Sequence, residues 1–205
     1  MAAKGWQVLQ VAYSNSSDLR YKLAGVDTVI STINGDAQLA LIDAAAAAHV
    51  RRFIPSEFEG SPSARSTNDI FDRGRRAALS RLQHYEAYGM RFAVFTCGVF
   101  YERFGPGGMR AYQIGLRSGI SGEGQYVLDI RNCKAMIPHR SSVADSVYIC
   151  LTSARDVARF VVAALDLPSW PREFRVRGAR MTINQLVSIG ESLRGKRSHI
   201  VRYDA

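Results

Sequence analysis

The stretch from Val26 to Pro55 constrains the fold of this chain more than any other part of its sequence. Val26–Ile33 is rich in β-branched residues and almost continuously apolar, which is typical of a strand covered on both faces of a parallel sheet. Ala37–His49 consists of strong helix formers, and Arg52–Pro55 follows as a second short strand. A strand, a helix and a strand within about 30 residues form the unit that joins neighbouring parallel strands.

The same alternation continues along the chain. Apolar residues recur at helical spacing in Ile70–Tyr88, and Phe92–Val99 has the composition of another buried strand. Strands that alternate with helices predict an α/β fold with a doubly wound parallel sheet. Further elements are expected as strands at Trp6–Tyr13, Gln125–Ile130, Ser146–Leu151 and Glu173–Val176, and as helices at Leu19–Leu23, Met109–Leu116, Arg155–Leu167 and Thr182–Arg194.

Composition restricts the class of protein. Hydrophobic residues make up 47%, which is enough for one globular domain with or without a small subdomain. The sequence has no apolar run long enough to span a membrane and no apolar signal near Met1, and three scattered cysteines suit a reducing compartment, so a cytoplasmic protein is expected. The net charge of +9 comes without a nucleic-acid-binding motif, so it indicates attraction for phosphorylated ligands, not a nucleic-acid partner.

A ligand site is expected where the parallel strands end. Open parallel sheets bind ligands beyond the carboxyl ends of their strands, which selects Ser31–Asn34, Pro55–Phe58 and Thr96–Phe100. Small polar residues there allow close approach of a ribose or a phosphate, and Phe58 with Phe100 could form an apolar wall for a nicotinamide ring. The alternative is that Ser56 and Thr96 are turn residues and the two phenylalanines belong to the core.

These segments resemble a known family. Gly25–Ile33 is similar to the "GVD-VIST" strand of the NmrA-like and isoflavone-reductase-like proteins, a branch of the atypical short-chain dehydrogenases. Arg51–Phe58 resembles their "KRF-PSEFG" segment, with Glu59 in place of the usual glycine. Cys97–Phe104 resembles the "cG-FyE-F" segment, and Ser153–Phe160 resembles a later helix start.

The resemblance implies a Rossmann-like domain over residues 1–104 that binds NADP or NAD. It also implies a smaller α/β region over residues 105–205 that covers a small-molecule substrate, with 146–167 returning to the main sheet. Family members include reductases of phenylpropanoid-type ethers and isoflavones, and regulatory proteins that bind the dinucleotide without evident catalysis. The residues expected to bind the cofactor are Thr32, Ile33, Asn34, Pro55, Ser56, Phe58, Cys97, Gly98 and Phe100; no metal site is expected.

Two departures from the family pattern bear on function. The family opens with a strand and a G-x-x-G-x-x-G loop, whereas the first strand here resembles its third, so the opening strand–helix–strand and its phosphate loop are expected to be missing. The family lysine that serves as general acid or base falls at Ala78 by a gapless count from Gly89. The chain also has no Tyr-x-x-x-Lys pair, so Tyr101 and Glu57 are the candidate catalytic residues, with a structural role as the alternative for each.

Three hypotheses follow for the function. The first is an NAD(P)H-dependent reductase of a small aromatic or carbonyl metabolite, in truncated form. The second is a non-catalytic protein that senses the dinucleotide, which the alanine at position 78 favours. The third is a non-functional truncated product. A sheet without its opening strands leaves an edge uncovered, so a protein partner at that edge is also expected.

Overall fold

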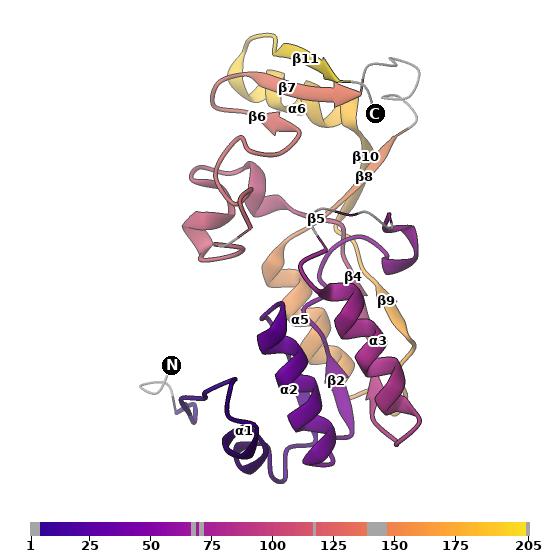
Figure 1. The fold of residues 1–205 in the computed structure, drawn as a ribbon. Coiled ribbons are helices and arrows are strands. Elements are labelled where there is room, and N and C mark those ends of the chain that lie inside the picture. Colours follow the sequence, from indigo (N-terminus) through magenta and orange to yellow (C-terminus); the bar gives the residue numbers. More distant parts are fainter. Residues whose placement is uncertain (1–4, 67–68, 70–71, 117, 139–146, 204–205) are drawn as a thin grey trace. The chain divides into compact units, whose positions relative to one another are not determined.

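The chain divides into two compact units. In the computed structural model, residues 5–66, 69, 72–116, 118–138 and 147–203 are described (Figure 1). Unit 1 comprises Met1–Phe58, Pro62–Thr96 and Leu167–Phe174, and unit 2 comprises Glu59–Ser61, Cys97–Asp166 and Arg175–Ala205. The boundary expected between residues 104 and 105, and the return of 146–167 to the main sheet, stay predictions.

Unit 1 is built on a parallel sheet of strand order β1-β2-β3. Its elements are α1 (Ser16–Lys22), β1 (Thr28–Ile30), α2 (Asp36–Ala47), β2 (Arg52–Ile54), the 3₁₀ turn η2 (Pro62–Ala64), α3 (Arg75–Glu86), β3 (Arg91–Phe92) and β4 (Val94–Thr96). β4 pairs with β9 (Glu173–Arg175), which comes much later in the chain. In register, Thr28 lies beside Arg52 and Arg52 beside Arg91, all parallel. The alternation of parallel strands and helices confirms the predicted α/β fold.

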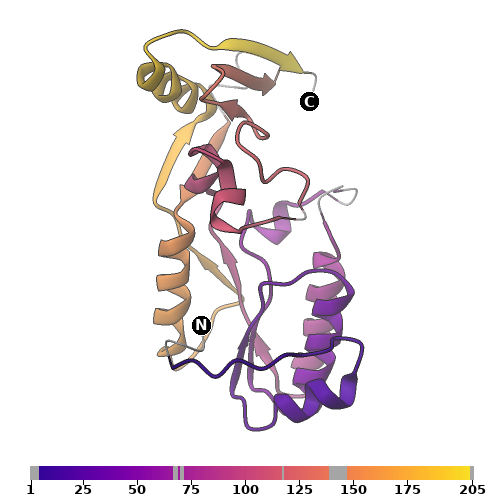
Figure 2. The ribbon, with the colours of Figure 1, turned by 90° about the vertical axis from the view of Figure 1, so that its left-hand side faces the viewer.

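The core of unit 1 lies between this sheet and two helices. Figure 2 shows α2 and α3 on the same face of the sheet. Val29 and Phe53 of the sheet pack against Ile42 of α2 and Leu82 of α3. β1, expected to be covered on both faces, buries Val29 but leaves Ile30 42% exposed, whereas Phe53 and Ile54 of β2 are buried. β1 stands at one edge of the sheet, and the protein partner expected there stays a prediction.

The N-terminal part of the chain departs from expectation. Trp6–Tyr13 was predicted to be a strand, but the structure places none there, and Trp6, Val8 and Leu9 are exposed. Alternating apolar residues stabilise a strand only where another strand supplies backbone partners and a core covers one face. α1 begins at Ser16, not at Leu19, because Asn15 Oδ1 accepts the Asp18 N–H at 3.0 Å and caps the helix.

Unit 2 contains two small sheets, of orders β10-β8-β5 and β11-β7-β6. Its elements are β5 (Val99–Phe100), η3 (Tyr101–Phe104), η4 (Gly108–Tyr112), β6 (Leu128–Asp129), β7 (Lys134–Pro138), β8 (Tyr148–Thr152), α5 (Ala154–Leu165), β10 (Ala179–Thr182), α6 (Ile183–Arg194) and β11 (His199–Tyr203). β5 runs parallel to β8, and β10 antiparallel to it. Ala135 and Ile137 of β7 pack against Leu186 and Val187 of α6.

The two long helices of unit 2 begin where their sequences predict. Ser153 accepts the N–H groups of Arg155 and Asp156 at the start of α5. Thr182 and Gln185 form a reciprocal capping box at the start of α6, which Gly195 ends in a left-handed conformation. Two other expectations need correction: Met109–Leu116 is a 3₁₀ turn over Gly108–Tyr112, and the strand at Gln125–Ile130 is reduced to Leu128–Asp129.

Candidate functional site

The carboxyl ends of β1 and β2 bring two predicted site segments to one edge of the sheet. Ile30 and Ile54 are partners in the parallel ladder, and the Ser31 N–H donates to Ile54 O at 2.8 Å. The residues that follow them must therefore emerge side by side. Thr32 and Asn34 are exposed, so their hydroxyl and amide groups are available to a ligand.

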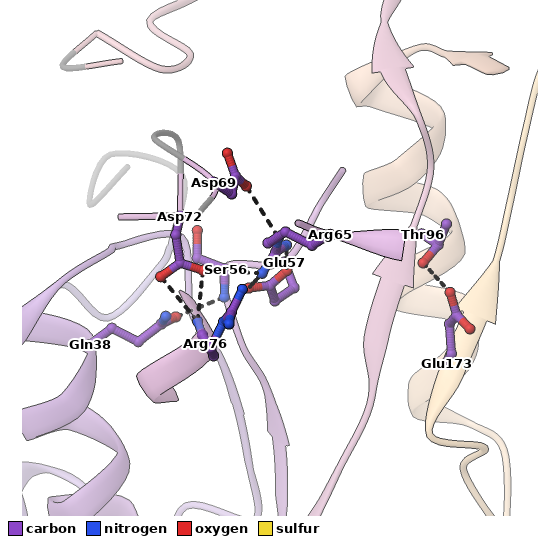
Figure 3. A network of polar contacts seen from close by, with 9 residues as sticks. All are labelled: Gln38, Ser56, Glu57, Arg65, Asp69, Asp72, Arg76, Thr96 and Glu173. Atoms are coloured by element: carbon purple, nitrogen blue, oxygen red, sulfur yellow. Dashed lines mark hydrogen bonds and ion pairs between the residues drawn. The ribbon is translucent and has the colours of Figure 1, made fainter. Parts of the chain in front are cut away.

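A buried glutamine fixes the second of these segments. The backbone N–H of Ser56 donates to Oε1 of Gln38 at 2.7 Å, which ties the loop after β2 to the first turn of α2 (Figure 3). Gln38 is 0% exposed. Its Nε2 is a buried donor that finds no partner among the described residues. Sequence reasoning missed Gln38, although a lone amide within an alanine-rich helix was a usable signal.

Glu57 is held in an ion pair. Glu57 is 2% exposed, and its carboxylate accepts from Arg65 at 2.6 Å, with a longer contact of 3.4 Å to the second nitrogen (Figure 3). Arg65 also lies 3.6 Å from both Asp69 and Asp72. An arginine so close favours the charged carboxylate, which suits holding the loop and suits proton donation poorly. The catalytic role of Glu57 stays a prediction, and no sequence pattern identified Arg65 as its partner.

Phe58 belongs to a row of aromatic rings within unit 1. Its ring centroid is 6.2 Å from that of the buried Phe95, which stacks on Phe174 at 4.8 Å. Trp170 contacts Phe174 edge to face at 6.3 Å. Thr96 follows Phe95 along β4, and its hydroxyl donates to Glu173 at 2.5 Å (Figure 3). Phe58 therefore packs against a buried ring, which agrees with the alternative expectation that it belongs to the core.

Cys97 and Gly98 begin unit 2 in a tightly packed connection. The hydroxyl of Thr152 donates to Cys97 O at 2.6 Å, and the N–H groups of Cys97 and Gly98 donate to Glu59 O at 2.9 and 3.1 Å. Burial raises the pKa of the Cys97 thiol to about 12, with a further contribution from the negative charge of Glu59. The thiol is therefore neutral and unreactive at physiological pH.

Gly98 is required by geometry. Its φ is +71°, and a Cβ atom there would lie 2.2 Å from the carbonyl oxygen of Cys150 on β8. Only glycine allows the two backbones to approach so closely. Phe100 follows on β5, half-buried, beside Thr152. Binding of a cofactor by Cys97, Gly98 and Phe100 stays a prediction.

Of the two predicted catalytic residues, Tyr101 is more exposed than Glu57. Its side chain is 39% exposed, and a Cβ atom at Gly178 would come within 3.3 Å of its hydroxyl. The next residue, Glu102, accepts the Ala154 N–H at 3.0 and 3.1 Å, so its carboxylate caps α5. Sequence reasoning missed Glu102, which anchors the turn that carries Tyr101.

The position counted as that of the family lysine lies in the core. Ala78 is 0% exposed within α3 and packs in the same cluster as Leu82 and Phe53. Arg75, one turn earlier, is also buried. Within the described part of the chain, no helix is long and apolar enough to cross a membrane, and no cluster of three metal-ligating side chains occurs.

Comparison with known proteins agrees with this architecture. Residues 1–203 match the family model described as the NmrA-like family. The oxidoreductase BOA1 of Botryotinia fuckeliana is 27% identical over 203 residues, which cover 93% of this chain and 62% of that protein.

Solved reductases share the fold. The ternary complex of leucoanthocyanidin reductase from Vitis vinifera superposes with a TM-score of 0.73 at 17% identity, covering 99% of this chain and 66% of that one. Structures of pinoresinol-lariciresinol and phenylcoumaran benzylic ether reductases give 0.74 at 18% identity, covering 100% and 64%. The chain thus spans less than two thirds of the length of these relatives. The family match and the shared fold confirm the resemblance found in the sequence: the chain belongs to the NmrA-like family.

Proposed function

We propose that the chain forms part of an NAD(P)H-dependent oxidoreductase that acts on a small aromatic or carbonyl metabolite. One observation carries the proposal: the parallel pairing of β1 and β2 brings the loops at Thr32–Asn34 and Pro55–Phe58 to one edge of the sheet. In open parallel sheets this edge is where nucleotide cofactors bind. BOA1 is described as an oxidoreductase, and one of the Vitis vinifera structures is a binary complex with NADPH.

The residues at this edge fit the sugar and carboxamide groups of a nicotinamide nucleotide. Thr32 and Asn34 offer exposed hydroxyl and amide groups, and Ser56, in the loop after β2, is half-buried. The unpartnered Nε2 of Gln38 would be satisfied by an acceptor that enters next to Ser56. When bound, a reduced nicotinamide supplies the hydride, and the protein supplies orientation and exclusion of water.

The remaining chemistry falls to the protein. Reduction of a carbonyl or ether requires a proton as well as a hydride, and the Tyr101 phenol is a donor with access to solvent. Glu57 is better suited to holding the loop, because its carboxylate is buried and accepts from Arg65. We therefore assign loop positioning to Glu57 within this proposal, and Tyr101, which belongs to unit 2, stays the candidate proton donor.

Nucleotide titration tests the proposal directly. NADPH and NADH are titrated into the protein by calorimetry, with the double variant T32V/N34A and the control S80A/Q83A, which alters exposed groups on α3. Loss of two hydrogen bonds of about 0.5–1.5 kcal/mol each should weaken binding about fivefold or more in T32V/N34A alone. Equal affinity of both variants, or no saturable binding by the wild type, would contradict the proposed site.

A second candidate is a dinucleotide-sensing protein without catalysis. The observation that favours it is Ala78, because an alanine in the core of unit 1 cannot replace a family lysine as acid or base. The two candidates differ in turnover alone. Oxidation of NADPH that depends on a metabolite, measured by absorbance over a panel of aromatic carbonyls and ethers, supports the reductase. Tight nucleotide binding without turnover supports the sensor.

A further inference from the structure

A groove between α2 and α3 lies away from the carboxyl ends of the strands. It is formed where α2 ends and β2 begins, and where α3 ends and β3 begins, which is the amino-terminal edge of the sheet. Its volume of about 600 Å³ falls within the range typical of small-molecule sites. The groove is lined by Asp43, Ala46, Ala47, His49, Val50, Arg51, His84, Tyr85, Tyr88, Gly89 and Met90.

The sequence of α2 explains why the groove exists. Ala46 and Ala47 present only methyl groups where longer side chains would fill the space between the helices. The buried residues Val50 and Met90 form an apolar floor. An open hollow with an apolar floor favours a flat, apolar ligand body because burial removes its surface from water.

Three aromatic rings from α3 and its C-terminal end form one wall. The ring of His84 lies 5.1 Å from that of Tyr85 and 5.3 Å from that of Tyr88, in tilted and edge-on arrangements. Tyr88 is 76% exposed although it is a large aromatic residue. Centroid separations of this size are those of interacting aromatic pairs, so another ring can extend the cluster.

The charges of the groove favour an anion. Asp43, the carboxylate among the lining residues, accepts two bonds from Arg81 Nη1 at 2.6 and 2.7 Å and one from the Tyr85 hydroxyl at 3.0 Å. Burial and Asp43 raise the pKa of Tyr85, so the phenol keeps the proton that it donates. Arg51 pairs with Asp27, but its guanidinium has five N–H donors and its side chain is largely exposed.

His49 adds a second donor beside Arg51. It follows Ala48, the C-cap of α2, and has φ +60°, in the left-handed region where helix ends usually place glycine. A residue other than glycine at such a position carries a backbone cost. Its imidazole lines the groove next to the apolar floor.

We propose that this groove is a binding site for a planar aromatic anion, with the ring against His84 and Tyr88 and the anionic group at Arg51 and His49. The site is separate from the proposed cofactor edge and does not depend on the proposed function. Aromatic carboxylates are its chemical class, because they combine a flat apolar body with a single negative group.

Ligand-observed NMR and calorimetry with benzoate test the proposal. Two comparison ligands separate its parts: benzyl alcohol keeps the ring without the charge, and cyclohexanecarboxylate keeps the charge without the aromatic ring. For so small a ligand we expect a benzoate dissociation constant on the order of 1 mM, with both comparison ligands at least about fivefold weaker.

Two variants locate the site. A46L fills the hollow and R51Q removes the charge, and each should weaken benzoate binding about fivefold or more. T32V/N34A, at the opposite edge of the sheet, should leave it unchanged, and thermal melting checks that each variant is folded. R51Q keeps the test informative if A46L does not fold. Equal binding of benzoate and benzyl alcohol, unchanged binding in both variants, or no saturable binding by the wild type would overturn the proposal.

Discussion

Replacing Gly98 by alanine tests how closely the start of β5 is packed against β8. A residue other than glycine at φ +71° costs about 1–2 kcal/mol for the left-handed conformation alone. The new Cβ would also lie 2.2 Å from Cys150 O and 2.8 Å from Cys150 C and Cβ, so backbone as well as side-chain atoms must move. Overpacking of this kind typically adds about 1–3 kcal/mol.

The sum, about 2–5 kcal/mol, is a large share of the stability of an ordinary domain. It should appear in urea denaturation followed by circular dichroism as a lower midpoint with an unchanged slope. The matched control is G195A, because Gly195 has φ +64° and a Cβ atom added there would meet no atom within 4 Å. G195A should therefore lower the free energy of unfolding only by the cost of the left-handed conformation, about 1–2 kcal/mol. If G98A and G195A lose the same free energy, the close approach to β8 does not have the cost argued for it.

Other contacts lead to predictions for stability and thiol reactivity. R65M should lower the free energy of unfolding by about 3–5 kcal/mol because it removes a cation that pairs with the buried carboxylate of Glu57. R65M/E57Q should recover part of that loss in the same denaturation assay. T182A should cost about 1 kcal/mol by removing the N-cap of α6, and T182S should cost far less. Ellman's reagent at pH 8 should label half-buried Cys150 before Cys97, whose raised pKa keeps it a thiol, and fast labelling retained in C150S would contradict this order. Because the folded state holds the Cys97 proton more tightly than the unfolded state, the free energy of unfolding should fall as pH rises from 9.0 towards about 12.

The elements that the sequence predicted well are those with local signals. The N-caps Ser153 and Thr182 and the C-terminal Gly195 mark their helices, because capping groups and the helix they stabilise lie within a few residues of each other. The strand–helix–strand unit around α2 was equally clear from its composition.

The elements that were missed depend on partners far away in the sequence. β7 and β11 pair in parallel, and the first paired residues are Lys134 and His199. Neither segment has a sequence pattern that by itself predicts a strand. Trp6–Tyr13 shows the opposite error, since its alternating pattern suggests a strand and the structure has none there. Pairing across such distances is decided by tertiary contacts, which local propensity does not contain.

The candidate site also contains residues that the sequence predicts and residues that depend on distant contacts. Thr32, Asn34 and Ser56 could be chosen from the sequence because the ends of parallel strands meet at one edge whatever the details of packing. The residues that hold this edge, Gln38 and Arg65, could not, because each acts through a contact many residues away. Candidate ligand groups could therefore be named from the sequence, and binding by them stays a prediction, whereas the side chains that hold their loops were missed.

The environment of Ala78 bears on the choice between catalysis and sensing. A catalytic lysine must bring its amine to the reacting group, but this position faces the apolar cluster that joins α3 to the sheet. A lysine there would lose hydration without gaining a partner, which is costly for a charged group. The alanine fits the core of unit 1 and supplies no acid–base group. A reductase would therefore need a proton donor from another element, and Tyr101 is the candidate named for that role. If Y101F abolishes turnover of NADPH while leaving nucleotide affinity unchanged, Tyr101 has taken the role of the lysine. If the wild type binds nucleotide tightly and turns over no metabolite, the same alanine supports a protein that senses the nucleotide without catalysis.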